Sequence, residues 1–242
     1  MTISPGVTGQ YTKNSIGGNV TAPLHSFGRL VNTTVFIILV FTALAISDRA
    51  GLSQKVLDYV ADKYGSRARN RLLDWEALME NNKNKSEAAK LKIVNNFFNR
   101  MKFVSDQIHW KQEDYWATPV EFLATRGGDC EDFSIAKYFT LRELGVPDKK
   151  MLITYVKALR LNQAHMVLTY YKTPNAEPLV LDNLIGKIKL ASKRKDLAPV
   201  YSFNGEGLWL SKKRGKGNRV GSSDRLSLWK DLGQRMEKGL TR

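Results

Sequence analysis

Apolar residues after position 50 recur at the spacing of helices. In three successive stretches an apolar side chain returns every three or four residues, which places these side chains on one face of a helix. The stretches are residues 53 to 64, 66 to 80 and 86 to 102. Gly65 can end the first, and Ser86 can cap the start of the third. The pattern therefore predicts three amphipathic helices, each with one buried face.

A fourth helix is predicted over residues 131 to 144, and the pattern changes after it. Gly145 and Pro147 supply the stop signal. The runs that follow are short, rich in β-branched and aromatic residues, and separated by turn residues, which is typical of strands. They cover residues 152 to 156, 166 to 171, 179 to 181, 200 to 203 and 208 to 210. Helices followed by strands predict an α+β fold in which the fourth helix packs on an antiparallel sheet.

The N-terminal segment contains an apolar run from Val35 to Ile46, with Thr42 as its one polar residue. The run is shorter than the roughly 20 residues of a membrane-spanning helix and suits the core of a signal peptide. The leader before it is long for a signal peptide, so an uncleaved anchor that contacts the membrane through residues 30–46 and an internal buried helix both stay open. We expect export. The expected division is residues 1–50 as signal peptide or anchor, 51–210 as the globular domain and 211–242 as a basic tail.

The C-terminal quarter of the chain is much more basic than the rest. The sequence has a formal net charge of +15, and residues 187–242 hold 15 basic and 5 acidic residues, an excess of 10. Such a basic end suits an acidic protein partner, an anionic lipid surface or simple solubility. The expected export and the lack of a basic motif interleaved with aromatic residues disfavour nucleic acid. The sequence contains no zinc-ligand spacing and no phosphate-binding loop.

The chain has one cysteine, Cys130, which lies between a pair of glycines and the predicted fourth helix. A single thiol cannot form an internal disulfide, so in an exported protein it is either buried and inert or chemically active. His165 and Asp182 follow it in the order expected of a thiol nucleophile, its base and the residue that orients the base. The helix N-terminus and a nearby imidazolium are expected to lower the pKa of the thiol.

Three acidic residues flank the cysteine: Asp129, Glu131 and Asp132. Their charges oppose formation of the thiolate. Acidic residues stabilise the first turn of a helix, and several carboxylates together also suit a hard cation such as Ca²⁺, which takes about six to eight oxygen ligands. The spacing matches no EF-hand loop. From the residues alone, helix capping and calcium binding both stay open.

Four short motifs follow one another along the chain. They are Asp114-Tyr115-Trp116-Ala117-Thr118-Pro119-Val120-Glu121, Gly128-Asp129-Cys130-Glu131-Asp132, Ala164-His165-Met166-Val167-Leu168 and Leu181-Asp182-Asn183. In this order they resemble the motifs of the bacterial transglutaminase-like cysteine proteinases. The resemblance extends from about Val94 to Leu210 and includes Asn95 and Asn99. It does not cover the N-terminal 50 residues or the basic tail.

The resemblance implies a papain/transglutaminase-like α+β fold and a periplasmic, calcium-dependent cysteine endopeptidase. Cys130 would be the nucleophile, His165 the general base and then acid, and Asp182 the orienting residue. The calcium ligands would come from Asp129, Glu131 and Asp132. We expect Trp116, in the first motif, to be a core residue rather than a substrate contact.

The resemblance also implies a substrate and a regulator. Proteases of this family cleave a large surface adhesin near its N-terminus, at a dialanine-type site, which releases the adhesin and promotes biofilm dispersal. The periplasmic domain of an inner-membrane cyclic-di-GMP receptor of the LapD type inhibits them. Two other functions stay open: a transglutaminase-type acyl transferase, and a non-enzymatic interaction module of the same fold.

Overall fold

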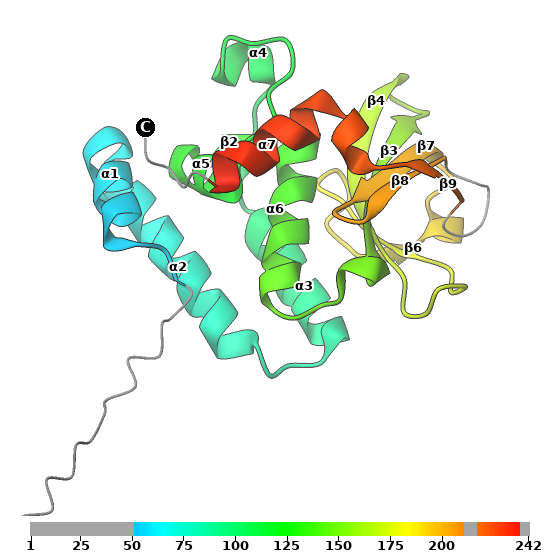
Figure 1. The fold of residues 1–242 in the computed structure, drawn as a ribbon, viewed down its shortest axis with the longest axis horizontal. Coiled ribbons are helices and arrows are strands. Elements are labelled where there is room, and N and C mark those ends of the chain that lie inside the picture. The colour runs from blue at the N-terminus through cyan, green and yellow to red at the C-terminus, as the bar shows by residue number, and fades with distance from the viewer. Residues whose placement is uncertain (1–50, 211–216, 238–242) are drawn as a thin grey trace, which may run out of the picture. The chain divides into compact units, whose positions relative to one another are not determined.

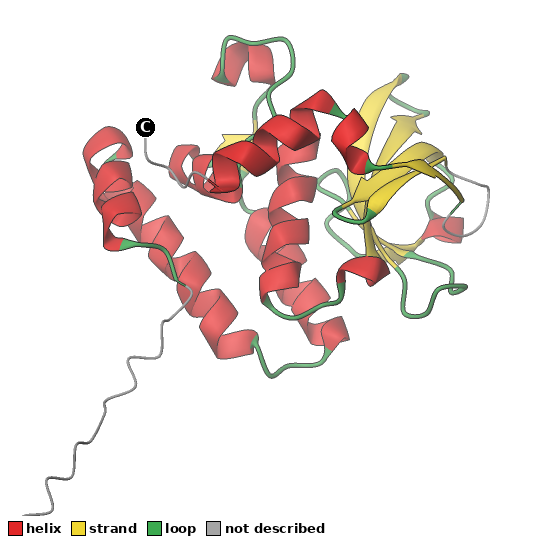
Figure 2. Cartoon of the chain, viewed as in Figure 1, coloured by secondary structure: helices red, strands yellow, loops and turns green. Residues whose placement is uncertain are grey.

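The computed structural model describes residues 51–210 and 217–237. Within them the helices gather on one side and the strands on the other, as Figures 1 and 2 show. This arrangement confirms the expected α+β class. None of the described helices is long and apolar enough to cross a membrane. The apolar run from Val35 to Ile46, and the division expected for residues 1–50, lie outside the described residues.

The first two predicted helices are present, and the second ends two residues later than the predicted residue 80. α1 (Gln54–Tyr64) begins after Ser53, whose Oγ accepts a hydrogen bond from the backbone N–H of Val56 at 3.3 Å. Gly65 separates α1 from α2 (Ser66–Asn82) and has a φ of 85°, a conformation that glycine adopts without a steric penalty. Sequence signals at helix ends therefore located this pair.

The third helix is shorter than predicted. α3 (Glu87–Phe98) ends before residue 102 because the chain turns into β1 (Lys102–Phe103), which pairs in parallel with β2 (Gly127–Gly128). Two short helices, α4 (Asp106–His109) and α5 (Pro119–Thr125), lie between β1 and β2. Local apolar periodicity does not reveal a pairing between such distant segments.

A seven-stranded antiparallel sheet forms the second half of the fold. Its strand order is β6-β5-β4-β3-β7-β8-β9. The strands are β3 (Met151–Ala158), β4 (Gln163–Tyr170), β5 (Leu179–Leu181), β6 (Lys189–Leu190), β7 (Leu197–Asn204), β8 (Gly207–Leu210) and β9 (Asn218–Gly221). β4 pairs with β5, and Leu168 lies opposite Leu181. This pairing brings together the two segments that carry His165 and Asp182.

The helix α6 (Cys130–Glu143) joins the two halves. Tyr138 and Leu141 of α6 are fully buried in one apolar core together with Ile153, Leu168 and Phe203 from the sheet. Because the strand residues alternate between the two faces of the sheet, this core uses only one face. The α6 packing fixes the position of its N-terminal residue, Cys130, against the sheet.

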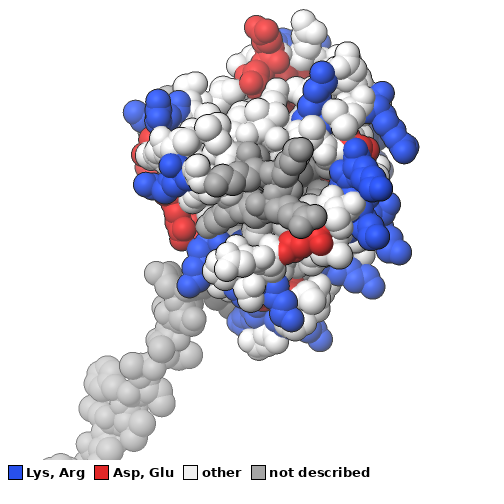
Figure 3. All heavy atoms as spheres, turned by 90° about the vertical axis from the view of Figure 1, so that its right-hand side faces the viewer, with Lys and Arg blue, Asp and Glu red and all other residues white. Residues whose placement is uncertain are grey.

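The C-terminal segment is part of the fold, which differs from the basic tail expected after residue 210. β9 extends the sheet beside β8, and α7 (Ser227–Glu237) buries Trp229 and Leu232 in the main core. The apolar side of α7 packs on protein, which differs from the anionic lipid surface considered for the basic tail. Basic side chains gather along the flanks of the sheet side of the molecule (Figure 3).

Candidate active site

Cys130 is the first residue of α6, and the glycines before it make this position sterically demanding. Gly127 and Gly128 form β2, which runs beside β1 and leads directly into the helix. A Cβ atom on Gly128 would lie 2.1 Å from Oδ2 of Asp132. Asp132 is fully buried, so its carboxylate has no room to move away. Only glycine fits at position 128 while the Asp132 carboxylate keeps its place.

We expect Gly128→Ala to destabilise the protein by about 2 kcal/mol or more, since overpacking at a buried site forces backbone or side-chain shifts. Thermal unfolding measures this loss. Gly233→Ala in α7 is the matched control, because a Cβ there meets no atom within 4 Å and alanine favours a helix over glycine. Equal melting temperatures for Gly128→Ala and the wild type would contradict the packing described for Asp132.

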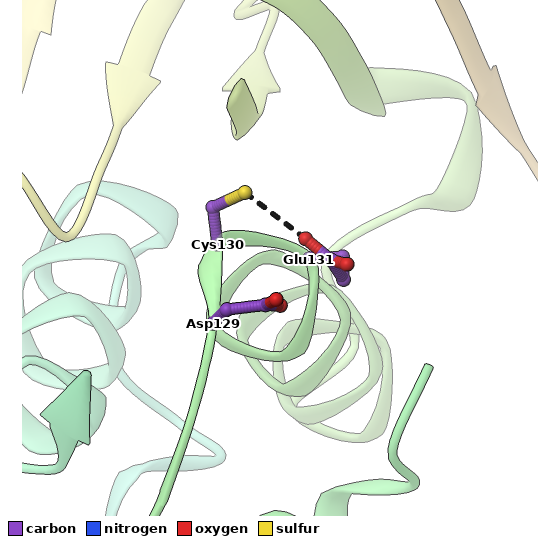
Figure 4. Close-up of side chains that lie close together, drawn as sticks. All are labelled: Asp129, Cys130 and Glu131. Carbon is purple, nitrogen blue, oxygen red and sulfur yellow. Dashed lines mark hydrogen bonds between the residues drawn. The ribbon is translucent and has the colours of Figure 1, made fainter. Parts of the chain in front are cut away.

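The Cys130 thiol is half-buried and hydrogen-bonded. Its Sγ donates to Oε2 of Glu131 at 3.0 Å, as the dashed line in Figure 4 shows, and the backbone of Met166 in β4 also hydrogen-bonds the sulfur. Burial, and after it the charges of Glu131 and Asp129, raise the pKa of the Cys130 thiol. The expectation that the helix N-terminus would lower this pKa is therefore wrong for the metal-free protein, because the adjacent carboxylates and the loss of solvent outweigh the helix dipole.

His165 and Asp182 form a buried pair. Oδ1 of Asp182 lies 2.8 Å from Nε2 of His165, and both side chains are almost completely excluded from solvent. Burial alone would raise the pKa of Asp182, but the hydrogen bond and charge of His165, with Leu184 and Arg194, lower it. Because the carboxylate is ionised and accepts, Nε2 of His165 must carry the donated proton. Nδ1 is then the nitrogen that can act as a base.

Cys130, at the start of α6, contacts the strand that carries His165. Its sulfur hydrogen-bonds the backbone of Met166, the residue after His165. Within the residues that the structure describes, no hydrogen bond joins the sulfur to the His165 ring; the thiol proton points to Glu131. Hydrogen bonds between catalytic groups are often long in a free enzyme and tighten when substrate binds. The sulfur thus contacts the backbone next to His165, and the roles of nucleophile and base stay predictions.

Five carboxylates gather beside the cysteine. Oxygen atoms of Asp106, Asp114 and Glu131 lie within 4.8 Å of one another, and so do those of Asp106, Asp129 and Asp132. Oδ1 of Asp106 and Oδ1 of Asp129 are buried and have no hydrogen-bond partner among the described residues. Buried carboxylate oxygens without donors are expensive unless a cation compensates them. The donor set therefore fits a hard cation that prefers oxygen ligands.

The raised pKa values of the clustered carboxylates also favour a bound cation. Burial raises the pKa of Asp106 to about 6, that of Glu131 to about 7 and that of Asp129 to about 8, and neighbouring carboxylates add to each of these shifts. Without a cation the folded protein therefore holds a proton on Asp129, and in part on Glu131, near neutral pH. A positive charge in the cluster would restore their ionised forms.

Asp132 has a structural role in addition to any role in metal binding. Its Oδ1 accepts from the backbone N–H of Ala117 at 2.7 Å, and its Oδ2 accepts from the backbone N–H of Asp129 at 3.3 Å. The second contact belongs to helix capping, one of the two alternatives that the sequence left open. Asp132 as a calcium ligand stays a prediction.

Several residues of the site were not identified from the sequence. Asp106 and Asp114 come from the segment around α4, and Arg194 comes from the turn before β7. Asn99 donates from Nδ2 to the backbone oxygen of Asp182 at 2.8 Å. Asp114 lies in the first quoted motif and Asn99 belongs to the wider resemblance, which is a signal that could have singled them out; Asp106 and Arg194 carry no local signal. Trp116 is buried and stacks on Phe203, as expected for a core residue.

Comparison with known proteins decides the family. The sequence profile of the family of bacterial transglutaminase-like cysteine proteinases matches residues 70–198 of this chain. The chain belongs to this family. Sequence comparison with curated proteins gave no match.

Solved structures of a family member agree with this assignment. The chain is 47% identical to Legionella pneumophila LapG in its EGTA-treated form, with 77% of this chain and 100% of that chain covered and a TM-score of 0.68. For calcium-bound Legionella pneumophila LapG the identity is 48%, the coverage 76% and 99%, and the TM-score 0.65. The protein is thus a LapG-like cysteine protease with the fold of the bacterial transglutaminase-like proteinases.

Proposed function

We propose that this member of the bacterial transglutaminase-like cysteine proteinases is a calcium-dependent periplasmic endopeptidase. It cleaves the N-terminal region of a large surface adhesin at a dialanine-type site, which releases the adhesin and promotes biofilm dispersal. The periplasmic domain of an inner-membrane cyclic-di-GMP receptor of the LapD type inhibits it.

The observation that carries the proposal is the arrangement of Cys130, His165 and Asp182. A cysteine at a helix N-terminus lies against the strand that carries a histidine, whose far nitrogen is bonded to a buried carboxylate. In this arrangement Nδ1 of His165 takes the thiol proton as the sulfur attacks the peptide carbonyl, and then gives a proton to the leaving amine. Water hydrolyses the resulting thioester. Asp182 orients the ring and stabilises its protonated form.

Two observations support calcium. The carboxylate cluster around Asp129 and Glu131 contains buried oxygens without donors, and the solved LapG structures include calcium-bound and EGTA-treated forms. In this chain Asp106, Asp114, Asp129 and Glu131 would hold the ion. A bound Ca²⁺ supplies positive charge that offsets the carboxylates which now oppose ionisation of the thiol.

The substrate, the regulator and the compartment rest on the resemblance and on the apolar run near the N-terminus. Identity of 47% along the whole LapG chain supports a shared substrate class. The run from Val35 to Ile46 supports export. Exposed apolar side chains, Leu159 and Leu161 at the tip of the hairpin between β3 and β4, offer a surface for a protein substrate beside the strand of His165.

A cleavage assay tests the proposal. The purified protein is incubated with the N-terminal fragment of a large adhesin in calcium, and Cys130→Ala serves as the inactive control. We expect cleavage at a dialanine-type site by the wild type, and none by the variant, because the variant lacks the nucleophile. Equal cleavage by both proteins, or cleavage by neither with calcium present, would contradict the proposal.

The same assay separates hydrolysis from acyl transfer. With a primary amine added, a protease yields mainly free carboxyl termini, whereas a transglutaminase-type transferase incorporates the amine. Mass spectrometry of the products decides between them. Predominant amine incorporation would replace the protease assignment by a transferase.

A further inference from the structure

Asp182 is held by a second, fully buried group, the guanidinium of Arg194. Nη2 of Arg194 donates to Oδ2 of Asp182 at 2.7 Å, while the other oxygen, Oδ1, accepts from His165 and from the backbone N–H of Leu184 at 3.0 Å. We propose that Arg194 is a positioning residue for catalysis, which fixes the Asp182 carboxylate so that Oδ1 faces the His165 ring. The inference rests on the proposed function and deepens it.

The main chain holds Arg194 tightly. It follows the short helix η2 (Ala191–Lys193), where its backbone N–H donates to the oxygen of Ala191 at 2.9 Å and its own oxygen accepts from the N–H of Leu197 at 3.1 Å. Asp196, which is half-buried, binds the outer side of the same guanidinium through Nε and Nη2. The side chain of Arg194 is only 1% exposed. Arg194 therefore bridges a buried carboxylate and one at the surface.

The planar guanidinium of Arg194 suits the contact with both Asp182 and Asp196. A guanidinium presents several N–H donors in fixed directions, so one group can hold two carboxylates at once and restrict the rotation of each. A lysine ammonium at the same place would keep the charge but would lack the fixed, planar arrangement of donors. The Asp182 backbone is fixed separately, by Asn99. Arg194 thus holds Oδ2 of the Asp182 carboxylate, while His165 and the N–H of Leu184 bind Oδ1.

A second cation, Lys137 of α6, faces Asp182 but cannot replace Arg194. Its Nζ is buried and has no hydrogen-bond partner within the described part of the chain. The charge of Asp182 acts on Lys137, although burial lowers the pKa of this lysine to about 7. Lys137 therefore contributes charge near Asp182 and no orientation. This difference makes Lys137→Met a control for the effect of charge alone.

A cavity gives access to Arg194 from the other face of the sheet. It has a volume of about 1020 Å³, and Val156, Val167 and Val180 line it together with Arg194. A small guanidinium ion can enter a cavity of this size, so an Arg194→Ala protein is open to chemical rescue. Rescue by guanidinium, and not by ammonium, is expected of a group that acts through its geometry.

The test uses the full chain loaded with calcium and compares Arg194→Lys, Arg194→Met and Asp196→Asn. The first readout is the nitrogen NMR spectrum of the histidines labelled with ¹⁵N, which reports the ring tautomer without any need for a substrate. We expect the wild type and Asp196→Asn to hold His165 as a single tautomer protonated at Nε2. Both Arg194 variants should show a mixture of tautomers.

The second readout is cleavage of the adhesin fragment. The Arg194 variants should lose tenfold or more in kcat with KM within twofold of the wild type, while Asp196→Asn and Lys137→Met stay within threefold. A single Nε2 tautomer with unchanged kcat in both Arg194 variants, or an equal loss in Asp196→Asn, would overturn the proposal. If Arg194→Met fails to fold, Arg194→Lys decides. If the wild type cleaves nothing, the proposed function is wrong. The NMR spectrum of the His165 tautomer still tests whether Arg194 positions Asp182.

Discussion

His165→Ala should lower kcat for cleavage of the adhesin fragment by about 10³-fold or more, with a much smaller change in KM. Positioned proton transfer typically contributes about 10² to 10⁴ in rate, and here the same ring must take the thiol proton and protonate the leaving amine. The loss should be large because the thiol is otherwise protonated: burial and the charges of Glu131 and Asp129 raise its pKa. Steady-state kinetics in calcium measure the effect.

His109→Ala is the matched control for this experiment. His109 is the other histidine in the described part of the chain, and its ring packs on Trp110 with the ring centroids 4.6 Å apart. It makes no contact with Cys130 in the hydrogen bonds of the site. We expect kcat within twofold of the wild type. Comparable losses in the two histidine variants would indicate general damage to the fold and refute the assignment of His165 as the base.

Removal of calcium should abolish activity and make thermal stability fall as the pH rises from about 4 to 8. In the metal-free fold the pKa of Asp106 is about 6, that of Glu131 about 7 and that of Asp129 about 8, all above their ordinary values. The folded state then binds more protons than the unfolded chain throughout this range, so the unfolding free energy decreases with increasing pH. A bound cation reverses this by favouring the ionised carboxylates.

Thermal unfolding in EGTA and in excess calcium, at pH 5, 6, 7 and 8, checks this prediction. The two melting temperatures should be closest at pH 5 and furthest apart at pH 8. A ligand present at about 100 times its dissociation constant stabilises the native state by about 2.7 kcal/mol. Asp106→Asn and Asp129→Asn should reduce the calcium effect, whereas Asp74→Asn, on the exposed side of α2, should not. Identical melting curves with and without calcium at pH 8 would contradict a cation site in this cluster.

The helices and the order of the site residues could be predicted from the sequence because each has a local signature. Ser53 and Gly65 fix the ends of α1 through bonds and dihedral angles that involve only near neighbours. Cys130, His165 and Asp182 stand out because each is a reactive residue type next to a helix start or within a strand pattern. The contact of Cys130 with the strand of His165 follows from the packing of α6 on the sheet, and the pairing of His165 with Asp182 follows from the antiparallel pairing of β4 with β5.

The remainder of the site depends on contacts between distant segments. Asp106 reaches the carboxylate cluster, and Arg194 reaches Asp182, only after the chain has folded around α6. The role of the C-terminal segment was missed for a related reason. Its basic composition is typical of a solvated tail, while the burial of Trp229 and Leu232 depends on aromatic residues of α6 and the sheet, such as Phe139 and Phe203.

The thiol pKa shows how composition can mislead when one effect is considered alone. A helix N-terminus favours the thiolate by a modest amount that falls off within the first turn. Two carboxylates in the same turn and the loss of solvent act in the opposite direction and are larger. The ionisation of the Cys130 thiol therefore depends on the charge state of Asp129 and Glu131, which links the proposed nucleophile to the proposed cation site.

The central claim is that the sulfur of Cys130 and the ring of His165 work as a nucleophile and base, and alkylation of this single cysteine by iodoacetamide tests it most directly. The rate constant is measured at pH 7 against free cysteine, in calcium and in EGTA. We predict that in calcium Cys130 reacts about tenfold faster than free cysteine, and that His165→Ala or EGTA brings the rate below that of free cysteine. A rate in calcium at or below that of free cysteine, unchanged by His165→Ala, would contradict the account.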